Sequence, residues 1–167
     1  MSTLRANTIT NVAGNSDIGN VGKILQVVQT FKGDTTTTTS TSFGDISGMS
    51  ATITPSSAGN KVLVSFTLHL SSNNSPVVLV NLLRGTTNIA QPTVTDTYHS
   101  TLQLWADADR MITQNYEFLD SPSTTSATTY KLQWRVHNGS PTVKLNGYFN
   151  NTQYNTTSTL TLKEVAA

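Results

Sequence analysis

The chain has 167 residues, a length that fits one domain with a hydrophobic core of its own. Only 11% of the residues are charged and the formal net charge is +1, so the composition implies neither a nucleic-acid footprint nor an acidic partner surface. There is no cysteine, which excludes disulfides, thiolate chemistry and cysteine-ligated metals.

Apolar runs in the sequence are far too short to span a bilayer, and no secretory signal opens the chain. We therefore expect no membrane insertion and synthesis in a host cytoplasm. Residues 1–22 hold only scattered apolar side chains among Asn, Thr and Gly, and they cannot form a core. They are expected to be a docking arm for another protein, with an edge strand or a frayed terminus as alternatives. The candidate docking residues are Leu4, Ile9, Val12 and Ile18.

Residues 23–167 read as one domain of short strands and frequent turns. A strand over residues 23–31 leads to a Thr-rich segment at 34–42, which favours an exposed loop or edge strand over a binding surface. A short strand at 49–54 ends at a Pro- and Gly-containing turn. Residues 61–70 alternate apolar and polar side chains, which predicts a central core strand.

Residues 77–83 are apolar on both faces, which a strand with one face in water does not need. We expect one face to meet a neighbouring subunit. The alternative is a strand covered by the chain's own long loop. The candidate interface residues are Val77, Leu79, Val80 and Leu82.

Further strands are predicted at 98–105, 110–119, 130–136, 142–145 and 158–165, with a connection or edge strand at 88–97 and a loop at 147–157. The count is eight to ten strands without helical periodicity. This predicts an all-β fold, an antiparallel β-sandwich of jelly-roll type preceded by an extended N-terminal arm. A different Greek-key sandwich is the alternative.

Chemically reactive constellations are missing from the sequence. The three histidines lie in separate strand contexts without metal-ligand spacing, and the acidic pair at Asp107 and Asp109 favours a plain turn over a cation site. No nucleophile elbow or phosphate-binding loop occurs. We therefore expect a protein that is not an enzyme and that uses no cofactor or metal.

Aromatic side chains gather in the loop at 147–157. Tyr148, Phe149 and Tyr154 lie among Asn and Gln residues, a composition suited to stacking on sugar rings. The competing interpretation is that they cap the end of the sandwich or line a subunit contact. Trp105 and Trp134 are expected to be core or interface anchors.

Several segments together resemble a family of small bacteriophage virion proteins, found in marine phages and cyanophages and labelled tail-fibre or structural proteins. They are GKILQVVQT at 22–30, TITPSS at 52–57, NKVLV at 60–64, FLDSP at 118–122 and YKLQWR at 130–135. The opening STLRANTIT at 2–10 resembles the N-terminal segment of many such fibre proteins.

The resemblance implies a jelly roll similar to the trimeric complement and tumour-necrosis-factor-like heads, in which each subunit buries one sheet face against its neighbours. It further implies a homotrimer in the virion, a short fibre or decoration protein held to other head or tail proteins by residues 1–22. The alternative is a receptor-binding tail-fibre module that recognises host surface glycans through the loop aromatics. A polysaccharide hydrolase is disfavoured because no paired acid and base carboxylates are evident.

Overall fold

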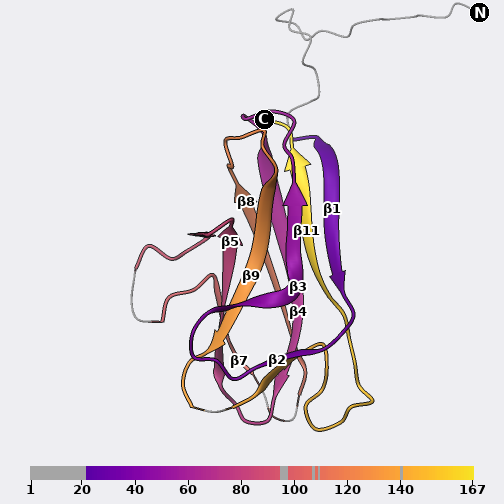
Figure 1. The fold of residues 1–167 in the computed structure, drawn as a ribbon, viewed down its shortest axis with the longest axis vertical. Helices are drawn as coiled ribbons and strands as arrows, with labels where there is room; N and C mark the ends of the chain where they lie inside the picture. Colours follow the sequence, from indigo (N-terminus) through magenta and orange to yellow (C-terminus); the bar gives the residue numbers. More distant parts are fainter. Residues whose placement is uncertain (1–21, 95–97, 107, 109, 140) are drawn as a thin grey trace, which may run out of the picture.

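The computed structural model describes residues 22–94, 98–106, 108, 110–139 and 141–167. The predicted docking residues Leu4, Ile9, Val12 and Ile18 and the acidic pair Asp107 and Asp109 lie outside the described residues. Among the described residues there is no helix, and eleven strands form two antiparallel sheets (Figure 1). None of the described segments is a helix of the length and hydropathy that crossing a membrane requires.

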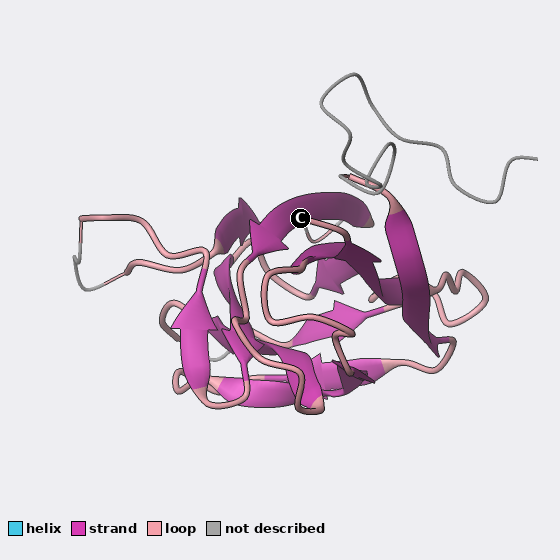
Figure 2. Ribbon diagram, turned by 90° about the horizontal axis from the view of Figure 1, so that it is seen from above, coloured by secondary structure: helices cyan, strands magenta, loops and turns pink. Residues whose placement is uncertain are grey.

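Sheet A contains β1 (Ile24–Lys32), β2 (Thr36–Thr38), β4 (Lys61–Ser72), β8 (Ile112–Asp120), β10 (Val143–Leu145) and β11 (Ser158–Val165). Sheet B contains β3 (Gly44–Ile53), β5 (Val77–Arg84), β6 (Thr87–Ile89), β7 (Leu102–Trp105) and β9 (Thr128–Val136). Seen from above, the strands surround a common interior (Figure 2). Buried apolar side chains from both sheets fill it as one core.

Strand pairing follows the order of a jelly roll, in which the chain is folded back on itself and then rolled up. The eleven strands occupy eight positions, because β1 and β2, β6 and β7, and β10 and β11 each share one. The first position pairs with the last (β1 with β11, β2 with β10), and the second with the seventh (β3 with β9). The third pairs with the sixth (β4 with β8), and the fourth with the fifth (β5 with β6 and β7). The jelly-roll prediction is confirmed.

Alternating side chains build the core from each strand. In β4 the even-numbered residues from Val62 to Leu70 are at most 2% exposed, while the odd-numbered ones face outward and are half-buried. β4 pairs with β8 along one edge and with β11 and β10 along the other, so it is the central strand that its alternation predicts. The additional strands beyond the predicted count are three-residue segments such as β2 and β6, too short for an alternating pattern to register.

β3 starts five residues earlier than the sequence predicts. Its pairing with β9 is interrupted between Asp45 and Ser50, where Gly48 has a positive φ of 79°. Glycine adopts this left-handed conformation at no steric cost, which permits a bulge within the strand. Because the bulge breaks the alternation of apolar and polar side chains, the first half of β3 was not predicted as a strand.

β5 requires a correction of the predicted subunit contact. Val80 and Leu82 point into the core, and Leu79 on the opposite face is also fully buried, so a single chain already covers these three side chains. Next to Leu79, the amide oxygen of Asn81 accepts hydrogen bonds from the Gln91 side chain and the Thr101 backbone, at 3.3 and 3.4 Å. The connection between β6 and β7 therefore folds back on β5, as the alternative interpretation expected. Of the four candidate interface residues, only Val77 keeps exposed surface.

Candidate functional site

The outward face of β1 is more apolar than its inward face. Leu25, Val27 and Phe31 point away from the core, and Val27 and Phe31 are 58% and 66% exposed. The residues between them that point inward include Gln26 and Thr30. In an isolated sandwich the apolar side of a strand usually faces the core, so β1 has the reverse orientation. A shift of one residue in register would turn its apolar side inward.

Polar contacts hold β1 in the observed orientation. The Gln26 amide donates to a Glu164 carboxylate oxygen and to the Thr54 carbonyl, each at 2.7 Å. The Thr30 hydroxyl donates to the Ser50 carbonyl at 2.6 Å. The inward polar groups are thus satisfied, and the exposure of the apolar set follows from the fold itself.

A row of three apolar residues and one lysine crosses sheet A from β1. The strand register places Val27 beside Lys163, Lys163 beside Leu63, and Leu63 beside Leu119. Leu63 is half-buried and Leu119 is 48% exposed. Side chains of four strands therefore present a largely uncharged surface, the exposed face of sheet A, with a small number of lysine and glutamate side chains.

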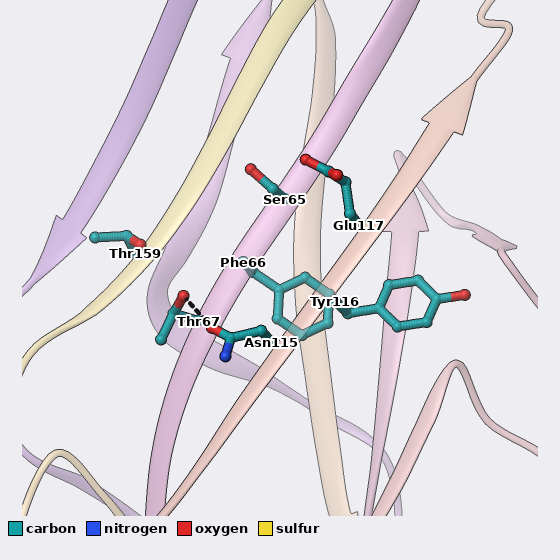
Figure 3. Close-up of a pocket in the computed structure, with 7 residues that line it drawn as sticks. All are labelled: Ser65, Phe66, Thr67, Asn115, Tyr116, Glu117 and Thr159. Carbon is teal, nitrogen blue, oxygen red and sulfur yellow. Dashed lines mark hydrogen bonds between the residues drawn. The ribbon is translucent and has the colours of Figure 1, made fainter.

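A shallow depression of about 340 Å³ lies on this face between β4, β8 and β11 (Figure 3). Its surface is lined by hydroxyl, amide and carboxylate groups, and the Thr67 hydroxyl donates to the Asn115 amide oxygen at 2.7 Å. The rings of Phe66 and Tyr116 lie beneath it and are stacked with centroids 5.7 Å apart. The residues that line the depression are Ser65, Phe66, Thr67, Asn115, Tyr116, Glu117 and Thr159.

The outward face of sheet B is different in character, with cationic side chains from β9. The Lys131 ammonium pairs with the Asp45 carboxylate at 2.9 Å, and the Gln133 amide donates to the same carboxylate at 2.7 Å. The Arg135 guanidinium lies 5.0 Å from the centroid of the Phe43 ring. The contacts of Lys131 and Gln133 with Asp45 are thus made within a single chain.

Beside these cations, a second depression of about 280 Å³ opens at the edge of sheet B. The strand register puts Val77 directly across from Trp105, and the His137 backbone amide donates to the Val77 carbonyl at 2.9 Å. The Tyr98 ring meets the His137 ring edge-on, with centroids 4.0 Å apart at 75°. Trp105 is 71% exposed, compared with 66% for Phe31 and 62% for Tyr154.

Trp105 is thus not in the core, so of its two predicted roles, core anchor or interface anchor, the structure excludes the first. The alternation of side chains in β7 explains this exposure. Leu104 is buried, so its neighbour Trp105 must point to the opposite face of the sheet. Trp134, by contrast, is 3% exposed and belongs to the core, as predicted.

The predicted sugar-contacting aromatics lie together in the loop between β10 and β11. The Tyr148 and Tyr154 rings meet edge-on with centroids 6.2 Å apart, and a backbone hydrogen bond from Tyr148 to Tyr154 closes the loop at 3.0 Å. Tyr154 is 62% exposed, whereas Tyr148 and Phe149 are half-buried. The loop therefore offers one freely accessible ring.

Three titratable groups of the described residues, His69, Asp120 and Glu164, are engaged in structural contacts. His69 shares a hydrogen bond of 2.9 Å with the Thr113 hydroxyl, and burial lowers the pKa of its imidazole. No cluster of three or more metal-ligating side chains occurs within the described part of the chain. The buried carboxylates Asp120 and Glu164 bind side chains of neighbouring strands and loops. These arrangements stabilise the fold and offer no poised acid, base or nucleophile.

Comparisons with known proteins give a likeness of fold. No protein-family model matches the sequence, and no curated protein matches it. Structures of infectious bursal disease virus match 85% of this chain: the Gt strain at a TM-score of 0.48 and 12% identity, the Gx strain at 0.44 and 14%, and the VP2 subviral particle at 0.43 and 13%. The match spans 38% of the first of those chains and 37% of the other two. At these values the likeness carries no statement about function.

Proposed function

We propose that this protein is a non-enzymatic structural component of a bacteriophage particle, a homotrimeric short fibre or decoration protein. The resemblance of its sequence segments to small virion proteins supports the class of protein. The observation that carries the proposal is the exposed face of sheet A. There, the fold directs the apolar side of β1 away from the core, and Val27 and Phe31 remain exposed in a single chain.

A copy of the same chain is the partner that this face fits. Exposed apolar patches on soluble domains mark contact surfaces, and in a closed ring of three copies this face of each chain would pack against a different surface of its neighbour. The low net charge of +1 also leaves little electrostatic repulsion between copies. The hydroxyl and amide groups of the central depression are able to pair across such an interface, with Thr67 and Asn115 already bonded to each other.

Lysine substitutions on the face test the trimer. Phe31→Lys and Leu119→Lys are each expected to convert a particle of three times the 18.0 kDa chain mass into monomers, because a buried unpaired ammonium is costly at an interface. Light scattering on the purified full chain measures the mass. Trp105→Lys and Tyr154→Lys are matched controls, since both replace exposed aromatic residues elsewhere. A monomeric wild type, or equal dissociation in the controls, would contradict the proposal.

Attachment to the particle is assigned to residues 1–22, with Leu4, Ile9, Val12 and Ile18 as the apolar contacts. A chain that begins at Gly22 keeps the backbone hydrogen bond from Gly22 to Ala166, at 2.8 Å, which closes β1 against the end of β11. We expect this shortened chain to retain the mass of the full chain and to lose binding to particles assembled without the protein. Co-sedimentation with such particles measures the loss. Equal binding by both chains would remove the anchoring role.

Host glycan recognition through the loop at 147–157 is the second candidate function. It is supported by the exposed Tyr154 ring and its edge-on contact with Tyr148, which gives the ring a fixed position. A rigid, exposed aromatic ring is suited to stacking on the apolar face of a sugar. Phe149, the neighbour of Tyr148 in the loop, is half-buried.

A further inference from the structure

From the second depression we infer a binding site for a neutral hexopyranose, the terminal sugar of a glycan, at the edge of sheet B. The site is formed by Val77, Tyr98, Gln103, Trp105 and His137, and it is distinct from the loop at 147–157. It depends neither on the proposed structural role nor on the oligomeric state.

Position in the fold explains why an aromatic ring is left uncovered here. The registers of β5 with β7 and with β9 align His137, Val77 and Trp105 in one row on the outward face of sheet B. Among the described strands, β7 is the outermost at this end of the sheet, so none of them lies beyond Trp105. Trp105 therefore forms an open wall that is 71% exposed.

The opposite wall is held in place by three contacts. The Tyr98 ring meets the imidazole of His137 edge-on, and the Arg135 guanidinium lies 5.9 Å from the centroid of the Tyr98 ring. The Gln103 side-chain amide donates a hydrogen bond to the Tyr98 carbonyl. A ring fixed in this way loses little conformational freedom when a ligand binds. The site is thus formed before any ligand arrives.

The chemistry of the five side chains that line the site indicates which class of ligand fits it. Its surface combines two aromatic rings and a valine with an imidazole and an amide, and none of the five side chains carries a fixed charge. Such a mixture suits a molecule with an apolar C–H face and a rim of hydroxyl groups, which describes a hexopyranose. The volume of about 280 Å³ fits one sugar ring rather than a longer stretch of chain. The absence of a charged group among these five residues favours a neutral sugar over a uronic or sialic acid.

Saturation-transfer NMR on the full chain tests the inference with the methyl glycosides of glucose, galactose, mannose and N-acetylglucosamine as probes. We expect at least one to bind with a millimolar dissociation constant and to receive saturation chiefly on the ring protons of one face. Trp105→Ala should reduce the signal about tenfold, as expected when a stacking contact of roughly 1.4 kcal/mol is lost. Trp105→Phe should retain part of it.

A variant of an exposed apolar residue outside the site is the matched control. Val94→Ala is expected to leave the signal unchanged, since Val94 is 73% exposed and does not line the site. Trp105 is exposed, so its replacement should not shift the thermal melting curve, and this is measured alongside. The inference is overturned if no probe binds at up to about 50 mM. It is also overturned if binding survives in Trp105→Ala or is lost in Tyr154→Ala, which would place the sugar on the loop.

Discussion

Replacement of Glu164 with alanine is expected to lower the free energy of unfolding by about 3 kcal/mol. The Glu164 side chain in β11 is 1% exposed, and its carboxylate accepts four hydrogen bonds. They come from the Gln26 side chain, the Ser56 backbone and hydroxyl, and the Asn60 amide, at 2.6 to 2.7 Å. These contacts join β1 and β11 to the connection between β3 and β4. Without the carboxylate, several buried donors lose their acceptor.

The pH dependence gives a second measurement of the same contact. Burial raises the pKa of the Glu164 carboxyl, but the hydrogen bonds from Asn60, Gln26 and Ser56 outweigh burial and bring the pKa to about 2, against an ordinary value of 4.5. Because the folded-state pKa is depressed, the stabilisation is present above about pH 4.5 and is lost as the pH falls towards about pH 2. The wild type should lose about 3 kcal/mol relative to Glu164→Gln over this range.

Chemical denaturation at several pH values measures both effects. Glu117 is the other glutamate of the chain, and it is exposed on sheet A, so Glu117→Gln is a matched control that should change stability by less than about 0.5 kcal/mol. The role assigned to Glu164 fails if Glu164→Gln and Glu117→Gln show the same stability and the same pH profile. Contributions from other carboxylates cancel in this comparison.

Strand identity was predictable from the sequence wherever alternation was strict. β4 and β9 were read correctly because every second residue is apolar, and the final strand was predicted with its observed bounds at 158–165. Pairing order was not visible in this pattern, since alternation says which face is buried but not which strand is the neighbour. The count of short strands and turns predicted a jelly roll, the resemblance to virion proteins implied the same fold, and the pairing of first and last strands confirms it.

Functional surfaces were harder to predict, for reasons that β5 and β1 illustrate. β5 is apolar on both faces, and the sequence alone did not reveal that the connection after β6 returns to bond with Asn81. β1 has an ambiguous pattern, and its orientation depends on the contact between Gln26 and Glu164, which are far apart in the chain. Contacts of this kind decide which apolar side is exposed. The sequence placed the subunit contact on β5. We propose the exposed face of sheet A instead, and only the three-dimensional arrangement made that choice possible.

Replacement of Asp120 with alanine is expected to cost about 3 to 4 kcal/mol, because Asp120 links the two sheets. It ends β8 in sheet A, and its carboxylate accepts both the Arg84 guanidinium of β5, at 2.8 and 3.0 Å, and the Tyr130 hydroxyl of β9, at 2.7 Å. The Asp120 and Arg84 side chains are 8% and 31% exposed, so part of the ion pair is screened by water. Removing the carboxylate leaves a cation and a fully buried hydroxyl without this acceptor.

Tyr130→Phe and Arg84→Met separate the two halves of this contact. Tyr130→Phe keeps the ring and removes one hydrogen bond, which should cost about 1 kcal/mol, and Arg84→Met should cost about 1 to 2 kcal/mol. Burial and the hydrogen bond to Asp120 raise the pKa of the Tyr130 phenol, so stability should fall as the pH rises above about 10, where the phenol ionises only in the unfolded chain. Tyr130→Phe should abolish that part of the alkaline decline.

A double-mutant cycle between Arg84 and Asp120 measures their coupling, which we expect to be about 1 to 2 kcal/mol because Arg84 Nη1 donates to both carboxylate oxygens and the contact is partly buried. Lys131→Met, which removes the more exposed ion pair with Asp45, is the comparison and should cost less than about 1 kcal/mol. If Asp120→Ala cost no more than Tyr130→Phe, the sheets would be held together by the apolar core alone. The larger loss would show that a single carboxylate also fixes how the edge of sheet A meets sheet B.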